Sequence, residues 1–120
     1  MHELSLAVAL VEEITRDAQQ RGLNRVTSIR LAVGKRAHLL PQSLQNCFDL
    51  LKTGTIMADA ELQIEITEPE FFCRHCGLRE RRNTLWANCT SCGRPALPAG
   101  GTELEIREYE GEAPHGGNDD

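Results

Sequence analysis

The sequence predicts an α+β fold in which two helices lie on a three-stranded sheet and a separate lobe is inserted before the last strand. Three observations predict this fold. Two segments repeat apolar residues with the spacing of a helix, and three others alternate apolar and polar residues as half-buried strands do. Between the second and third strands lie about thirty residues, far more than an ordinary loop needs. They show little periodicity but contain two C-x2-C pairs.

The composition of the 120-residue chain is that of a globular protein. Hydrophobic residues make up 40% and charged residues 26%, and the formal net charge of −5 weakly disfavours nucleic acid as the main partner. No apolar run approaches the roughly 20 residues that cross a bilayer. The acidic N-terminal segment does not resemble a signal peptide. We therefore expect a cytoplasmic protein, in which clustered cysteines are metal ligands more often than disulfides.

The first helix is expected from Leu4 to Arg21, because its apolar residues recur at steps of three and four. Gly22 follows where a left-handed cap would end the helix. The segment Arg25–Gly34 comes next and alternates as a half-buried strand does. The expected helix stripe comprises Leu4, Val8, Val11, Ile14 and Ala18, and the expected inner residues of the strand are Ile29, Leu31 and Val33.

The second helix is expected to begin at Pro41, since a first helical turn does not need the N–H that proline lacks. Cys47 lies beside the apolar stripe of this helix and is expected to be a small buried hydrophobe. The segments AELQIEITE and TELEIREYE predict the second and third strands. The apolar positions of these elements are Leu44, Phe48 and Leu51 in the helix, Leu62, Ile64 and Ile66 in the second strand, and Leu104 and Ile106 in the third.

These elements predict three parts of the chain. Residues 1–70 and 99–110 form the α+β domain, because two amphipathic helices and three strands can bury one another's apolar faces. Residues 71–98 form the inserted cysteine lobe. Residues 111–120 are rich in glycine and acidic residues and are expected to be a disordered tail.

The four cysteines of the lobe predict a zinc site. Cys73 and Cys76 form one C-x2-C pair, Cys89 and Cys92 form the other, and twelve residues separate the pairs. Two such pairs supply four thiolates for a tetrahedral ion, and a glycine after each pair suits the tight turn of a zinc knuckle. Structural zinc is favoured over a redox dithiol or disulfides. Four thiolates leave no open position for a substrate, so hydrolytic zinc chemistry is not expected.

The lobe is also basic, which raises an alternative function. Residues 71–98 contain five arginines and one glutamate. A basic zinc ribbon could bind nucleic acid or transcription machinery, but a solvated or protein-docking face is the simpler interpretation. His75 lies inside the first cysteine pair and is expected to be exposed or beside the ligands rather than a ligand. The charged residues are Arg74, Arg79, Arg81, Arg82, Arg94 and Glu80.

The first three residues could form a second metal site of a different kind. The amine of Met1, the amide and imidazole of His2 and the amide of Glu3 can surround one centre with nitrogen. Such a planar nitrogen set suits nickel(II) or copper(II). We expect Met1 to be retained because His2 is a large second residue. The simpler alternative is a solvated histidine at the start of a helix.

The sequence resembles the HypA/HybF family of hydrogenase nickel-incorporation proteins over residues 1–110. The resemblance rests on MHELSLA at the start, RVTSIRLAVG, LPQSLQNCFDLLKTGT and AELQIEITEPE, followed by CRHC and CTSC. It implies a non-catalytic nickel metallochaperone for maturation of the [NiFe]-hydrogenase large subunit. In the family, the N-terminal amine, the histidine and neighbouring backbone amides hold nickel, which here means Met1, His2 and Glu3. The family's four cysteines hold structural zinc.

The resemblance also implies partners. The family works with a nickel-binding accessory GTPase, and in some organisms it serves urease maturation as well. The first helix and its neighbouring strands would then contact the GTPase, and no membrane is involved. Both a monomer and a homodimer are compatible with the sequence. His38 lies in a loop more basic than the family's usual segment; it could be an accessory nickel ligand, but a solvated loop histidine is the favoured interpretation. His115, in the tail, is not expected to form a metal-storage tract.

Overall fold

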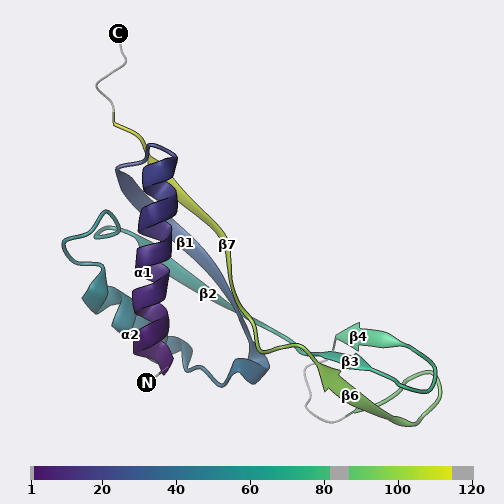
Figure 1. Cartoon of the computed structure of the whole chain (residues 1–120). Helices are drawn as coiled ribbons and strands as arrows, with labels where there is room; N and C mark the ends of the chain where they lie inside the picture. Colours follow the sequence, from purple (N-terminus) through teal and green to yellow (C-terminus); the bar gives the residue numbers. More distant parts are fainter. Residues whose placement is uncertain (1, 82–86, 115–120) are drawn as a thin grey trace. The chain divides into compact units, whose positions relative to one another are not determined.

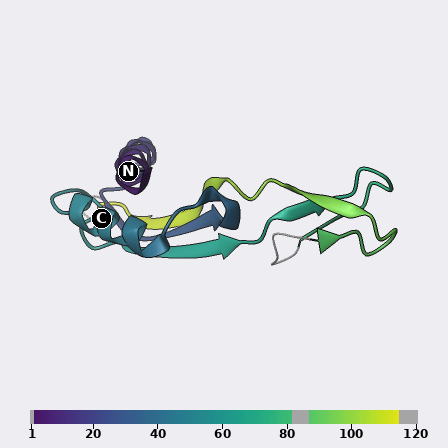
Figure 2. The ribbon, with the colours of Figure 1, turned by 90° about the horizontal axis from the view of Figure 1, so that it is seen from below.

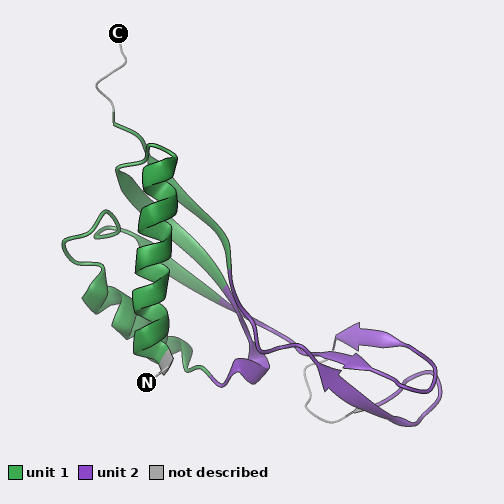
Figure 3. Ribbon diagram, in the orientation of Figure 1, with its two compact units in different colours: residues 1–31, 39–64, 106–120 green, residues 32–38, 65–105 purple. Residues whose placement is uncertain are grey.

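The computed structural model describes residues 2–81 and 87–114, and for His2 and Ala87 it describes the backbone alone. The chain divides into two compact units (Figure 3). Unit 1 comprises residues 1–31, 39–64 and 106–120, and unit 2 comprises residues 32–38 and 65–105. The α+β class is confirmed, with two helices, a three-stranded sheet and a second small sheet that carries the four cysteines.

Unit 1 begins with helix α1 (His2–Gln20), which starts two residues before the expected Leu4 and ends one residue before the expected Arg21. Gly22 follows with φ +75°, a left-handed conformation that glycine adopts at low cost. The buried stripe differs from the expected one. Leu4 and Val8 are 47% and 36% exposed, whereas Ala7, Leu10, Ile14 and Ala18 are buried. Because apolar residues occupy nearly every position from 4 to 11, periodicity does not determine which face of this helix is buried.

The three-stranded sheet has the order β2-β1-β7, in which β1 is Arg25–Gly34, β2 is Glu61–Thr67 and β7 is Leu104–Glu112. Strands β1 and β7 are antiparallel, since the N–H of Asn24 donates to the carbonyl of Glu112 and the N–H of Gly34 donates to that of Glu103. Hydrogen bonding between β1 and β7 therefore continues to Glu112, which is the second residue of the segment expected to be a disordered tail.

Helix α2 (Pro41–Leu51) begins with proline in its first turn, as predicted. It buries Leu44 and Phe48 and packs against α1. Figure 2 shows α1 end-on above one face of the sheet of unit 1. The helices, the sheet and the loop that precedes β2 supply the core of unit 1, which includes Ala7, Leu10, Ile14, Ala18, Val26, Ile29, Leu31, Leu44, Phe48, Met57, Ala60 and Leu62.

Unit 2 contains a second sheet that periodicity does not predict. Its order is β4-β3-β6-β5, with β3 at Glu70–Phe72, β4 at Arg79–Arg81, β5 at Ala87–Asn88 and β6 at Pro95–Ala99 (Figure 1). Phe71 is buried at its centre and pairs with Glu80 on one side and Pro98 on the other. A short 3-10 helix, η1 (Lys35–Ala37), also belongs to this unit.

Two glycines bring backbone segments of unit 2 into close contact. A Cβ atom on Gly34 would lie 2.2 Å from the carbonyl oxygen of Gly101, so no larger residue fits there without a shift of the backbone. The same oxygen accepts a hydrogen bond of 2.6 Å from the N–H of Arg36, whose Nη1 donates to the carbonyl of Gly100.

Within the described residues, no helix has the length and apolar character needed to span a bilayer.

Candidate metal centre

The four cysteines lie in two turns built on the same plan. One turn connects β3 to β4. There the backbone N–H of Cys73 donates to the carbonyl of Leu78, and the N–H of Gly77 donates to the carbonyl of Cys73. The other connects β5 to β6, where Cys89, Arg94 and Gly93 repeat these contacts. Both glycines have a positive φ, +81° and +79°. The tight turn of a knuckle therefore explains the glycine after each C-x2-C pair.

The sulfur atoms of the two turns converge. Cys73 Sγ lies 3.6 Å from Cys92 Sγ, Cys76 Sγ lies 3.4 Å from Cys89 Sγ, and all four lie within 4.8 Å of one another. Zinc–sulfur bonds of about 2.3 Å in a tetrahedron place sulfurs about 3.8 Å apart. A disulfide would need about 2.05 Å. The donor set and its spacing therefore fit a closed four-thiolate site of the type that binds zinc.

Backbone N–H groups favour the thiolate form of two of these cysteines. A hydrogen bond from the backbone N–H of Cys76, and to a smaller extent one from that of His75, lowers the pKa of the Cys73 thiol to about 6. The N–H groups of Cys92 and Ser91 point at Cys89 Sγ from 3.4 and 3.3 Å and lower its pKa. Because only a thiolate binds a metal, these contacts favour the metal-binding form at neutral pH.

The other two thiols remain protonated more readily. The backbone N–H of Leu78 favours the thiolate of Cys76. The contact with Cys89 and desolvation favour the thiol more strongly and raise the Cys76 pKa to about 11. The pKa of Cys92 is also raised, although the N–H of Arg94 opposes the shift. A divalent cation held by Cys73, Cys76, Cys89 and Cys92 would replace these protons and offset the repulsion among four thiolates.

His75 stands apart from the sulfur cluster. Its ring is exposed, and its Nδ1 accepts a 2.8 Å hydrogen bond from Nη1 of Arg94, since a guanidinium has only donors. The four converging metal-type side chains are the cysteines, without a histidine among them. Arg94 as the partner of His75 was not foreseen, and no short-range spacing signals it because nineteen positions separate the two residues.

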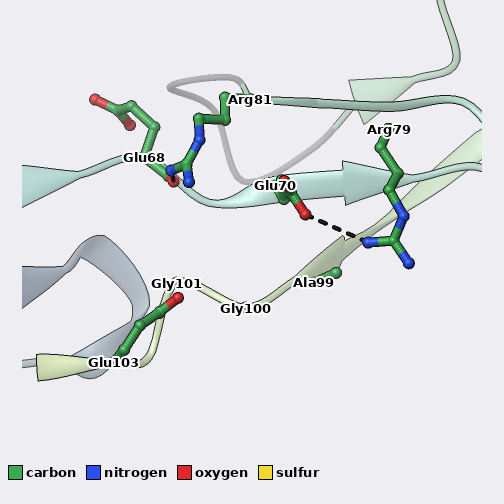
Figure 4. A pocket seen from close by; sticks show the side chains of 8 residues that line it. All are labelled: Glu68, Glu70, Arg79, Arg81, Ala99, Gly100, Gly101 and Glu103. Atoms are coloured by element: carbon green, nitrogen blue, oxygen red, sulfur yellow. Dashed lines mark hydrogen bonds and ion pairs between the residues drawn. The ribbon is translucent and has the colours of Figure 1, made fainter. Parts of the chain in front are cut away.

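Two arginines of the lobe make contacts within unit 2. Arg79 donates to Glu70 at 3.4 Å (Figure 4) and lies over the ring of Phe72 at 4.9 Å. Arg81 donates to the backbone carbonyl of Glu68. Both arginines line a pocket of about 200 Å³ together with three carboxylates. This mixed charge is poorly suited to a phosphate backbone, which needs unpaired cations. Arg82, Leu85 and Trp86 lie outside the described residues.

The three residues expected to bind nickel are only partly described. Met1 lies outside the described residues, and the backbone of His2 opens α1. Glu3 lies in the first turn, where its Oε2 accepts a 3.2 Å hydrogen bond from the backbone N–H of Leu40. Sequence reasoning did not identify Leu40, because the donor is a backbone group and the side chain is apolar. The nickel site therefore stays a prediction.

The remaining candidate residues are not gathered around a site. His38 is exposed and has a left-handed backbone with φ 59° at the end of η1. Cys47 is half-buried on α2. His115 lies outside the described residues.

A closed four-thiolate centre on a small sheet, combined with an α+β unit, defines a metal-binding protein of two units. The family model described as "Hydrogenase/urease nickel incorporation, metallochaperone, hypA" matches residues 1–111. The hydrogenase maturation factor HypA of Prosthecochloris aestuarii is 38% identical over 108 residues, which cover 89% of this chain and 96% of that protein. The factor of Rhizobium leguminosarum bv. viciae is 35% identical over 92% of this chain and 98% of its own.

Solved structures share the fold. A solution structure of HypA protein has a TM-score of 0.74 at 20% identity and covers 95% of this chain and 98% of its own. The solution structure of the Ni metallochaperone HypA from Helicobacter pylori has a TM-score of 0.69 at 19% identity and covers 93% and 98%. The chain belongs to the HypA family of hydrogenase/urease nickel-incorporation metallochaperones, which is a non-catalytic family.

Proposed function

We propose that this chain binds nickel(II) at Met1, His2 and Glu3 and delivers it to the large subunit of a [NiFe]-hydrogenase in the cytoplasm. The observation that carries the proposal is the family match, which begins at residue 1 and continues to residue 111. The matched segment thus contains both the Met-His-Glu start and the four cysteines. The relatives that it resembles are named hydrogenase maturation factors.

The chemistry of the two sites supports a division of labour between two metals. The Met1 amine, the amide and imidazole of His2 and the amide of Glu3 form a nitrogen-rich set, which favours the planar geometry of nickel(II). The first N–H groups of a helix have no partner within the helix, so the helical hydrogen bonds of α1 do not compete with a metal for them. Four thiolates instead retain zinc. Zinc is the resident, structural metal, and nickel is the cargo.

Delivery requires a partner that accepts or drives release of nickel. An accessory GTPase is the proposed partner, and α1 with its neighbouring strands is the proposed contact. Leu4 and Val8 support this surface, because both are apolar, exposed and within two turns of the N-terminus. A paired change of both residues to glutamine is expected to weaken binding of the GTPase at least tenfold in calorimetry while nickel affinity is unchanged.

Nickel(II) titration of the zinc-loaded, tag-free protein tests the proposed site. The native chain is expected to bind one nickel ion with the visible spectrum of a planar nitrogen site. His2→Ala is expected to lose that spectrum and the bound ion, as read by absorption and native mass spectrometry. His38→Ala and His115→Ala are matched controls that should behave as the native chain does. Equal nickel binding by the native protein and His2→Ala would contradict the proposed N-terminal nickel site.

Binding of nucleic acid by the zinc lobe is the alternative function. It predicts salt-dependent affinity for DNA or RNA that depends on Arg74 and its neighbours. The internal contacts of Arg79 and Arg81 disfavour it. Gel-shift measurements at low and physiological salt should therefore show no specific complex, and a complex lost in Arg74→Ala would favour the alternative.

A further inference from the structure

Strand β7 lies at one edge of the three-stranded sheet. In the order β2-β1-β7 it pairs with β1, and no strand in the described part of the chain pairs with its other edge. Figure 1 shows β7 on the outer side of β1. The strand is nine residues long, and its residues 106–112 belong to unit 1. An edge of this length presents a row of backbone donors and acceptors that can pair with another chain.

The hydrogen bonds of β7 show which backbone groups face this open edge. The carbonyl of Glu112 accepts the N–H of the residue just before β1, and the carbonyl of Glu110 accepts the hydroxyl of Thr27. Both carbonyls therefore point toward β1. Because backbone groups alternate in direction along a strand, the N–H and C=O groups of Tyr109 and Gly111 point toward the open edge. An added strand can use these groups.

A groove of about 340 Å³ lies against the same part of β7. Apolar side chains of Leu23 and Ile106 contribute to its lining. Tyr109 is held in place there, because its hydroxyl donates to Asp17 of α1. A strand added to β7 would direct every second side chain toward this groove. The lining residues are Arg21, Leu23, Ile106, Arg107, Glu108 and Tyr109.

The charges on the other face of β7 indicate what the added strand would carry. Glu108 and Glu112 form ion pairs with Arg30 and Arg25 of β1 at 2.9 and 3.0 Å. The exposed carboxylate of Glu110 has no ionic partner among the described residues. Opposite charges directly across two strands are stabilising, and like charges are destabilising. A basic residue is therefore favoured opposite Glu110, whereas β7 of a second copy would bring a second acidic face.

We propose that the open edge of β7 is a docking site for an extended segment of another protein in which basic and apolar residues alternate. The segment forms a fourth strand beside β7 and exchanges backbone hydrogen bonds with Tyr109 and Gly111. Its apolar side chains face the groove, and its basic side chains lie on the side of Glu110. Backbone bonds supply affinity in this mode of binding, and the alternating side chains supply selectivity. The edge contains no proposed metal ligand, so this inference goes beyond the proposed function and does not depend on nickel.

The test uses a capped heptapeptide of alternating lysine and valine as the probe, added to the zinc-loaded full chain. Amide hydrogen exchange is followed by NMR at saturating peptide. Exchange at the amides of Tyr109 and Gly111 is expected to slow about fivefold, the effect of one net hydrogen bond. The Glu110 amide faces β1 and should change by less than about twofold. Equal slowing at all three amides, or at none, would contradict an added strand.

Modified peptides separate strand pairing from simple attraction between charges. A fully N-methylated form of the probe keeps its side chains and charges but lacks backbone donors. It is expected to bind at least about tenfold more weakly, because several hydrogen bonds are lost. A heptapeptide of alternating glutamate and valine should also bind at least about tenfold more weakly. Equal affinity of the plain and N-methylated probes would overturn the proposal.

A charge reversal on the protein tests the chemistry of the occupant. Glu110→Lys is expected to weaken binding of the lysine probe about fivefold, because it replaces an opposite charge by a like one. Glu12→Lys makes the same change at an exposed position of α1 and should stay within about twofold of the native affinity. Equal affinities of the native chain and Glu110→Lys would contradict the assigned partner. A dimer in sedimentation that protects Tyr109 and Gly111 without peptide would instead assign the edge to a second copy.

Discussion

Each knuckle cysteine combines a metal-binding sulfur with backbone contacts of a turn. Cys89 is the clearest case, because its sulfur receives the N–H groups of Ser91 and Cys92 while its own N–H and carbonyl hold the turn. Binding of structural zinc at such a site releases about 10–16 kcal/mol. That free energy is large beside the few apolar residues that unit 2 buries, which include Ala32, Val33, Phe71, Cys73 and Cys89.

Cys89→Ser is therefore expected to abolish zinc retention and to unfold unit 2. The measurement is the zinc content by mass spectrometry together with the thermal unfolding curve. Cys47→Ser is the matched control, since Cys47 lies on α2 and outside the sulfur cluster. Full zinc occupancy in Cys89→Ser would contradict the assignment of the four cysteines as the ligand set.

Gly34 is a second residue with a defined physical requirement. Its φ of −68° suits any residue, so the close approach of the Gly101 carbonyl is the sole reason for glycine there. Gly34→Ala is expected to lower the free energy of unfolding by about 3 kcal/mol. Gly54→Ala is the matched control, since it meets no atom within 4 Å and pays only the strain of φ +80°, about 1–2 kcal/mol. Urea unfolding in which both variants lose the same stability would contradict this explanation.

At the scale of elements, α1 and β7 are joined by a polar contact near the C-terminal end of each. The hydroxyl of Tyr109 donates to Oδ2 of Asp17, which also accepts from Arg21. The Tyr109 contact and then Arg21 lower the pKa of Asp17 below its usual 3.8. Because the folded-state pKa is lowered, the stabilisation is present above the usual value. It is lost as the pH falls through the lowered value.

Tyr109→Phe is expected to raise the pKa of Asp17 toward its usual value, because it removes the largest cause of the shift. A pH titration of the Asp17 carboxyl carbon by NMR measures this directly. The ion pair with Arg21 remains, so the return is partial. An Arg21→Gln variant should also raise the Asp17 pKa, because it removes a second hydrogen bond and a positive charge. An unchanged Asp17 titration in Tyr109→Phe would contradict the role of the tyrosine contact.

The elements differ in how far the sequence determines them. The helices and the long strands were predictable, because each carries a repeat that packing requires, and Gly22 and Pro41 mark two ends. The small sheet was not, since strands of two to five residues with prolines in β6 are too short for alternation. The buried face of α1 was also ambiguous, so Leu4 and Val8 were wrongly assigned to the core.

The candidate sites, like the elements, were predictable from the sequence only in part. The spacing of the four cysteines predicted their convergence, because a C-x2-C turn can direct two sulfurs to one point. The contacts of Arg94 with His75 and of Glu3 with Leu40 were not predictable. Each joins residues far apart in sequence and depends on how the elements pack. Residue type also does not reveal a backbone donor such as the N–H of Leu40.

At the scale of the whole molecule, the proposed function assigns two metals to different sets of donor atoms. Four thiolates would enclose an ion and leave no open position, which suits a metal that stays. The proposed nickel ligands belong to the first three residues, and a site at a chain terminus suits a metal that must be handed over. In the proposed function, this difference in donor atoms and enclosure would allow one protein to retain zinc and transfer nickel.

The most direct measurement is a nickel titration of two zinc-loaded preparations that differ only in the amine of Met1, one free and one acetylated. Acetylation removes the charge and the nitrogen donor at the terminus and leaves every side chain in place. The account predicts one tightly bound nickel with a planar-type visible spectrum for the free amine and loss of both for the acetylated chain. Identical binding by the two preparations would contradict an N-terminal nickel site.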